Sequence, residues 1–261
     1  MSLNIGDALS SGAEKLTTTA GIQLGIAYVV LQLLTAVGSN SVVGAIETPG
    51  AGEMTAPALS LPIGTAAGSA LAMLGVVLNL VLTIVAFRTL AHSPSELGSI
   101  PDGVTSGLLK PAVFLVIASI VQGVAIFIGF IALIIPGIFL MISLIFTQLF
   151  IAVEDEGPFE ALSSSWSLAK GNRFPLFGLG VIIVVMSLLI SIPSGILSIF
   201  SPVAGSVVTY VITGFFSIFS WGVLVASYQQ LSNETAAVDA GTDDEDDGVQ
   251  RLDDDSGFDY A

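Results

Sequence analysis

The sequence predicts an all-α integral membrane protein, a bundle of six transmembrane helices with a short cytoplasmic interfacial amphipathic helix between helices four and five. The first observation is composition. Only 10% of the 261 residues are charged and the mean hydropathy is +0.92, whereas soluble domains carry about a quarter charged residues. The second is a series of apolar runs long enough to cross a bilayer. The third is the placement of the basic residues between alternate runs.

The apolar runs account for six spans. Residues 111–153 are apolar for about 43 residues, or some 64 Å as helix, which is about twice the hydrocarbon core of a bilayer. This stretch must turn back, and Pro136-Gly137 is the expected place because proline interrupts a helix. A region from Pro193 to Pro202 separates the last two spans. The other four spans are predicted over residues 20–37, 63–90, 176–192 and 203–228.

We expect the first span to be retained rather than cleaved as a signal peptide. A signal peptide needs a positive charge near Met1 and a small-residue cleavage site after its apolar core. Here the first basic residue is Lys15, just before the apolar run, and Ala36-Val37-Gly38 matches a cleavage site only weakly.

The basic residues support the count of six and set the orientation. With six crossings they all fall on one side of the membrane: Lys15, Arg88, Lys110, Lys170, Arg173 and Arg251. The loops after spans one, three and five contain no Lys or Arg, and a miscount by one span would destroy this sorting. The positive-inside rule therefore predicts a multi-pass protein of the cytoplasmic cell membrane with both termini cytoplasmic.

The short amphipathic helix is predicted over residues 158–170. Pro158 suits the first helical position, and Gly171 suits a left-handed C-terminal cap. At about 100° per residue the large apolar side chains share one side of the helix and most polar ones the other, and only Ser165 breaks the division. A helix of about 20 Å is too short to span, so we expect it in the membrane interface or packed under the bundle.

The negative charge is unevenly distributed. The net charge is −15, and residues 233–261 hold eleven acids and one arginine. We predict a six-helix domain over residues 1–232 followed by an acidic, disordered cytoplasmic tail over residues 233–261. Acid excess with scarce lysine is a halophile-like composition, typical of proteins that work in high salt. A polyanionic surface also argues against a nucleic-acid partner.

The composition offers little for catalysis or metal binding. There is no cysteine and a single histidine, His92, so thiolate and histidine-based metal sites are excluded. Glu154, Asp155 and Glu156 could hold a hard cation with help from Glu160, but acids ahead of a helix also complement its dipole, which is the interpretation that we favour. We predict no catalytic residue, no cofactor and no metal.

Two sets of residues are candidates for function. The first could contact lipid or a partner at the cytoplasmic face, and it comprises Pro158, Phe159, Leu162, Trp166, Lys170 and Arg173. Its two cations could bind anionic lipid head groups or only set the topology. The second could form interhelical hydrogen bonds or line a solute path, and it comprises Asn79, Gln122 and Gln148.

A family resemblance covers about 40 residues, from Pro136 to Phe174. Pro-Gly-Ile, an apolar span, Val-Glu-Asp-Glu-Gly-Pro, Glu-Ala-Leu, Ser-x-Ser-Leu and Lys-Gly follow one another here. This pattern resembles the membrane domain of some glycerophosphodiester phosphodiesterases and the related YciC-like membrane proteins. The resemblance implies a six-helix membrane protein. It carries over no catalytic site, because in the fused members catalysis belongs to a separate soluble domain that this chain lacks.

These observations favour a non-catalytic membrane protein, acting as a lipid-associated or partner-binding accessory or scaffold component. The alternative is a transporter or channel for a small, uncharged solute, which would need a polar cavity between the spans. An enzyme is the weakest hypothesis, because no nucleophile–base set is present. The sequence leaves the oligomeric state open.

Overall fold

The structure is a computed structural model that describes residues 3–46 and 59–250, with side chains up to Glu234 in the last helix. The fold is all-α, and the described residues contain no strand. Six helical stretches are long and apolar enough to cross a membrane, which confirms the predicted fold class. They are α2 (Thr19–Ala45), α3 (Gly64–Leu90), α4 (Leu109–Ala132), α5 (Ile134–Ser143) continued by α6 (Thr147–Val153), α8 (Arg173–Phe200) and α9 (Pro202–Gln250).

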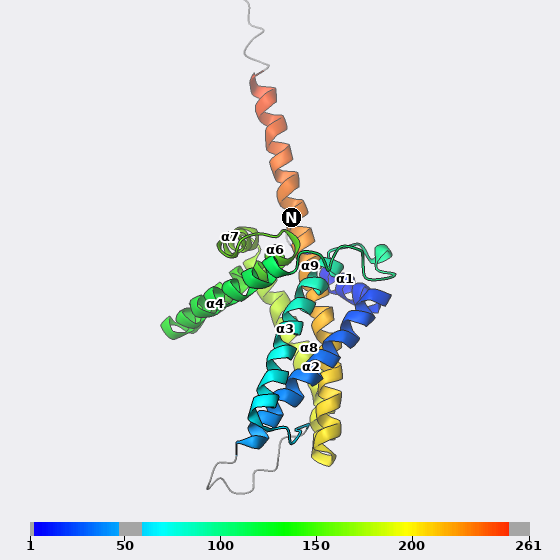
Figure 1. The fold of residues 1–261 in the computed structure, drawn as a ribbon. Coiled ribbons are helices and arrows are strands. Elements are labelled where there is room, and N and C mark those ends of the chain that lie inside the picture. The colour runs from blue at the N-terminus through cyan, green and yellow to red at the C-terminus, as the bar shows by residue number, and fades with distance from the viewer. Residues whose placement is uncertain (1–2, 47–58, 251–261) are drawn as a thin grey trace, which may run out of the picture.

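Four of the long helices form the bundle and the α4–α5 hairpin leaves it obliquely. α2, α3, α8 and α9 run side by side, whereas α4 points away from them (Figure 1). α2 and α3 approach closely through small residues, because a Cβ on Gly68 would lie 3.0 Å from the backbone oxygen of Gly38. Close approach of this kind supplies the van der Waals contact that holds helices together in lipid.

The five basic residues of the described part gather at one end of the bundle, which we call the basic end. Arg88 Nε donates to Ala152 O at 2.7 Å, Nη1 donates to Ser106 O at 2.7 Å, and Nη2 forms a 2.8 Å ion pair with Asp155. The buried core lies beside these contacts. Its largest members include Phe87, Ile84, Leu90, Leu149, Ile151 and Ile218. These contacts fix the helices to one another at the basic end, while α2 and α3 are also held together toward their other ends, at Gly38 and Gly68.

An amphipathic helix that we had not predicted precedes the first span at the basic end. α1 (Ile5–Thr17) begins at Asn4, whose side chain accepts a hydrogen bond from Asp7 N at 3.2 Å. It packs on α9, with Gly12 against the backbone of Val223. Lys15 is buried there and joins three helices, because its Nζ donates to Leu90 O at 2.6 Å and to the Gln229 side chain at 3.2 Å.

The turn of the α4–α5 hairpin was placed wrongly, three residues too late. Only Leu133 separates α4 from α5, and Pro136 and Gly137 lie in the first turn of α5. Proline is tolerated there because the first N–H groups of a helix have no intrahelical acceptor. Gly137 instead serves packing, since a Cβ on it would lie 2.5 Å from the Phe130 ring of α4.

The predicted break at Pro193 was also wrong. α8 continues through Pro193 to Phe200, and Ser201 alone separates it from α9. Membrane helices tolerate an internal proline when neighbouring groups compensate for the missing hydrogen bond. α9 then reaches Gln250, past the domain boundary expected at residue 233. The side chains after Glu234 and residues 251–261 lie outside the described part, so the disordered tail stays a prediction.

Candidate functional site

A short helix, α7 (Pro158–Ala169), lies beside the ends of α4 and α6 at the basic end (Figure 1). Pro158 is its first residue, and the Gly157 N–H donates to the Glu160 carboxylate at 3.4 Å. Lys170 follows the helix and is exposed, and Gly171 adopts φ +91°. The helix therefore begins at Pro158 and ends before Gly171, as these two residues indicated.

The side of α7 that packs on the bundle consists of small residues. Ala161, Ser165 and Ala169 are fully buried, whereas Phe159 is 68% exposed and Trp166 39% exposed. Leu162 is half-buried. Small residues allow two helices to approach closely in a membrane, and this leaves the large apolar residues to face outward. The predicted apolar side thus faces the surroundings, and Ser165 belongs to the packed side.

Ser165 stabilises a break in the fourth span. Its Oγ accepts from Phe146 N at 3.1 Å and donates to Ser143 O at 3.1 Å, both across the junction of α5 and α6. Gln122 of α4 donates to Leu144 O at the same junction at 3.1 Å. Backbone groups freed by a helix break need such partners away from water. The fourth span is therefore two helices, a feature that the uninterrupted apolar pattern concealed.

Arg173, the first residue of α8, is held between two aromatic rings. Its guanidinium carbon lies 4.4 Å from the Phe139 ring centre and 4.7 Å from that of Trp166. The two rings meet edge to face with centres 5.4 Å apart. Nε and Nη2 of Arg173 are enclosed and have no hydrogen-bond partner among the described residues. Stacking thus fixes the position of the guanidinium. Its Nε and Nη2 groups could still donate hydrogen bonds, but the described residues supply no acceptor for them.

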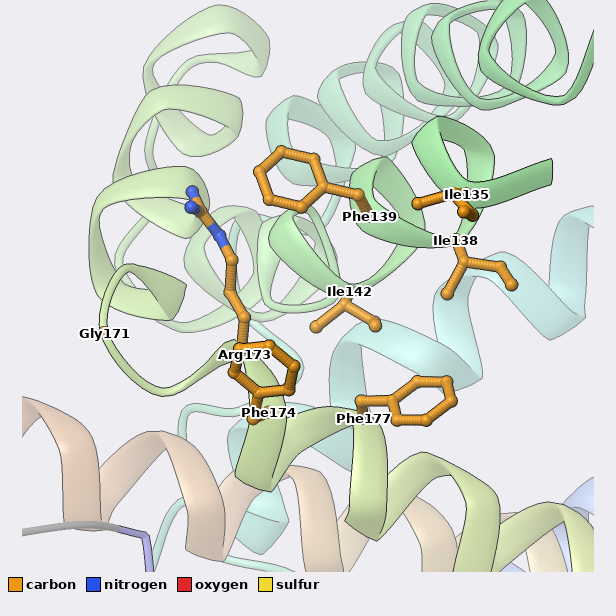
Figure 2. A pocket seen from close by; sticks show the side chains of 8 residues that line it. All are labelled: Ile135, Ile138, Phe139, Ile142, Gly171, Arg173, Phe174 and Phe177. Carbon is orange, nitrogen blue, oxygen red and sulfur yellow. The ribbon is translucent and has the colours of Figure 1, made fainter. Parts of the chain in front are cut away.

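A cavity of about 570 Å³ opens beside Arg173, and we call it the α5–α8 groove (Figure 2). One wall is a face of α5 and the other is the start of α8 with Gly171, which lies between α7 and α8 (Figure 2). Eight residues line it: Ile135, Ile138, Phe139, Ile142, Gly171, Arg173, Phe174 and Phe177. The only charged side chain among these eight is that of Arg173.

The structure brings only part of the first candidate set together. Trp166 and Arg173 are in contact, and Lys170 lies between them in sequence, while Phe159 is almost two helical turns from Trp166. Phe139 joins them and was missed. Its signal was present in the sequence, because Ile135, Ile138, Phe139 and Ile142 recur at the spacing of one helix face.

The second candidate set does not converge on a cavity. Gln122 makes the interhelical contact described above, whereas Asn79 and Gln148 are half-buried in α3 and α6. Two further cavities in the described part measure about 390 Å³, between α8 and α9, and about 640 Å³, around Arg88 and Lys110. Neither these nor the α5–α8 groove is lined by any of the three amides.

The three consecutive acids diverge from one another. Glu154 accepts from the Tyr228 hydroxyl, Asp155 pairs with Arg88, and Glu156 accepts from Ser164 Oγ at 3.0 Å. Burial raises the pKa of Glu156, an effect that the hydrogen bond from Ser164 opposes. Among the described residues no three acidic or histidine side chains are arranged to hold a metal ion.

Comparison with known proteins identifies the family. Residues 3–231 match DUF7847, a domain of unknown function. The chain belongs to the DUF7847 family. The DUF7847 match covers α1, α7, the first five candidate spans and the sixth as far as Leu231. No curated protein and no solved structure matches the chain.

The α5–α8 groove of this DUF7847 protein combines an apolar surface with one cation. An apolar groove with a stacked arginine at one end can hold an apolar chain and an anion together. Trp166 of α7 contacts two residues that line the groove, Phe139 and Arg173. The resemblance to membrane domains of glycerophosphodiester phosphodiesterases is not tested by the family match and stays a proposal.

Proposed function

We propose that this DUF7847 protein is a non-catalytic component of the cytoplasmic membrane, a lipid-associated accessory or scaffold protein with both termini in the cytoplasm. The observation that carries the proposal is the outward side of α7, where Phe159 and Trp166 are exposed. Trp166 contacts Arg173, and the exposed Lys170 follows the end of the helix.

Position and chemistry support an interfacial role for α7. The helix lies at the basic end, which the positive-inside rule assigns to the cytoplasm. Tryptophan favours the membrane–water interface, because its ring is apolar and its N–H can still reach water or head groups. Cations nearby attract the anionic lipids of the cytoplasmic leaflet, each contributing about 1 kcal/mol. The side of α7 that faces away from the bundle therefore meets head groups.

Fluorescence of a single tryptophan tests this placement directly. Trp166 and Trp221 are the two tryptophans, so Trp221→Phe leaves Trp166 as the reporter. In vesicles containing brominated phospholipids, we expect Trp166 to be quenched more by bromine near the head group than by bromine near the chain end. The matched control is Trp166→Phe, in which Trp221 packs against Phe87 and Tyr28 inside the bundle. Absence of quenching of Trp166 at every bromine depth would contradict the proposal.

Mutation of the outward side tests the accessory role itself. Phe159→Glu and Trp166→Glu put charge on that side, and we expect them to reduce the lipid or protein that co-purifies with the chain. Ser163→Glu is the control, because Ser163 is exposed on the same helix but belongs to its polar side. Equal retention by all three variants would count against an accessory surface on α7.

A further inference from the structure

Building on the proposed function, we propose that the α5–α8 groove binds one anionic phospholipid from the cytoplasmic leaflet. The phosphate would lie against the Arg173 guanidinium, and one acyl chain would run along the face of α5 that lines the groove.

The apolar walls fit a hydrocarbon chain. On α5, Ile135 is 79% exposed and Phe139 39% exposed, whereas Ile138 and Ile142 are half-buried. On α8, Phe174 is 90% exposed and Phe177 45% exposed. Both helices belong to candidate membrane spans, so we expect lipid around the groove. A volume of about 570 Å³ also falls within the roughly 300–1,000 Å³ of small-molecule sites.

The charged end of the groove fits a phosphate. Nε and Nη2 of Arg173 are enclosed without an acceptor in the described part, and the two rings that hold the guanidinium offer none. A phosphate accepts two parallel hydrogen bonds from an arginine, and these charge-assisted bonds are about twice as strong as neutral ones. Arg173 also begins α8, where the positive end of the helix dipole adds to its charge. No acid lines the groove to compete.

The apolar walls and the arginine together determine which ligand fits the groove. Inorganic phosphate or a soluble phosphate ester would use Arg173 and leave the isoleucine and phenylalanine walls unused. A zwitterionic lipid would bring its own cation close to Arg173, which disfavours it. An anionic lipid with its chains attached satisfies both the arginine and the apolar walls.

Native mass spectrometry of the purified full chain with added phosphatidylglycerol or phosphatidylcholine tests the proposal. We expect one phosphatidylglycerol to be retained in preference to phosphatidylcholine. Arg173→Gln should weaken its retention by about tenfold or more, since about 1.4 kcal/mol corresponds to tenfold. Ile138→Trp should weaken it too, by filling the groove while keeping the cation. Lys110→Gln is the control, because it removes an equal charge from an exposed residue at the basic end outside the groove.

Each outcome decides the proposal. Equal losses for Arg173→Gln and Lys110→Gln would show general charge attraction and overturn it. Full retention by Ile138→Trp would show that the lipid binds outside the groove. Displacement of the lipid by inorganic phosphate would show that the acyl chain does not contribute to binding, and would also overturn the proposal. Circular dichroism checks that each variant is folded. If Trp166 is quenched from the head-group region while Arg173→Gln changes nothing, the groove proposal fails and the interfacial role of α7 stands.

Discussion

Replacement of Ser165 by alanine tests how the broken fourth span is stabilised. Ser165 is fully buried, and its hydroxyl makes two hydrogen bonds to backbone groups, with Phe146 N and Ser143 O, both at 3.1 Å. Each bond contributes about 1 kcal/mol, and leaving a buried N–H unpaired costs about 1–3 kcal/mol. Ser165→Ala should therefore lower the free energy of unfolding by about 2–4 kcal/mol.

The assay is thermal unfolding in detergent, followed by Trp221 emission in a Trp166→Phe background. The expected loss corresponds to a fall of roughly 5–10 °C in the unfolding midpoint. Ser163→Ala is the matched control, because it makes the same change at an exposed position of α7 and should change stability by less than about 0.5 kcal/mol. If the two variants unfold at the same temperature, Ser165 does not stabilise the break and the reasoning is refuted.

Two further predictions concern the basic end. Burial lowers the pKa of Lys15 from 10.5 to about 8, so between these pH values the unfolded chain binds more protons than the folded one, and stability should rise with pH by up to about 3 kcal/mol. The measurement is the unfolding midpoint of the wild type and of Lys15→Met as a function of pH from 7 to 10.5. The same pH dependence in both proteins would contradict the prediction. Arg88→Gln should cost about 2–4 kcal/mol, because the Arg88 side chain is 14% exposed and donates to the carbonyl groups of Ala152 and Ser106. Asp155→Asn should cost less than about 1 kcal/mol, because Asp155 is 53% exposed. Chemical denaturation of the two variants tests this asymmetry, and equal losses would show that the ion pair itself dominates.

The spans and the ends of α7 could be predicted because local chemistry sets them. Apolar runs must be helical in lipid, since every backbone group needs an internal partner there. Pro158 and Gly171 act through their own backbone geometry, at the start and just after the end of α7. α1 could have been predicted as well, because Asn4 followed by Asp7 is a pattern typical of a helix start.

The rest depends on residues far apart in the sequence. The break in the fourth span is invisible in its own composition, because Ser165 and Gln122 supply its partners from two other helices. The packed side of α7 was unpredictable from amphipathicity alone, because lipid and protein interior are both apolar and small residues decide the contact. Arg173 contacts Phe139 because the α4–α5 hairpin brings α5 beside the start of α8. The turn of this hairpin depends on packing at Gly137 and not on Pro136 alone.

The orientation of the basic end tests the central claim most directly, because every proposal above places α7 on the cytoplasmic face. The chain has no cysteine, so single cysteines report their own side. Ser163→Cys lies on the exposed polar side of α7, and Leu61→Cys replaces a half-exposed residue between α2 and α3. With a membrane-impermeant maleimide on intact cells, we predict labelling of Leu61→Cys at once and of Ser163→Cys only after permeabilisation. Labelling of both from the same side, or the reverse order, would contradict the account.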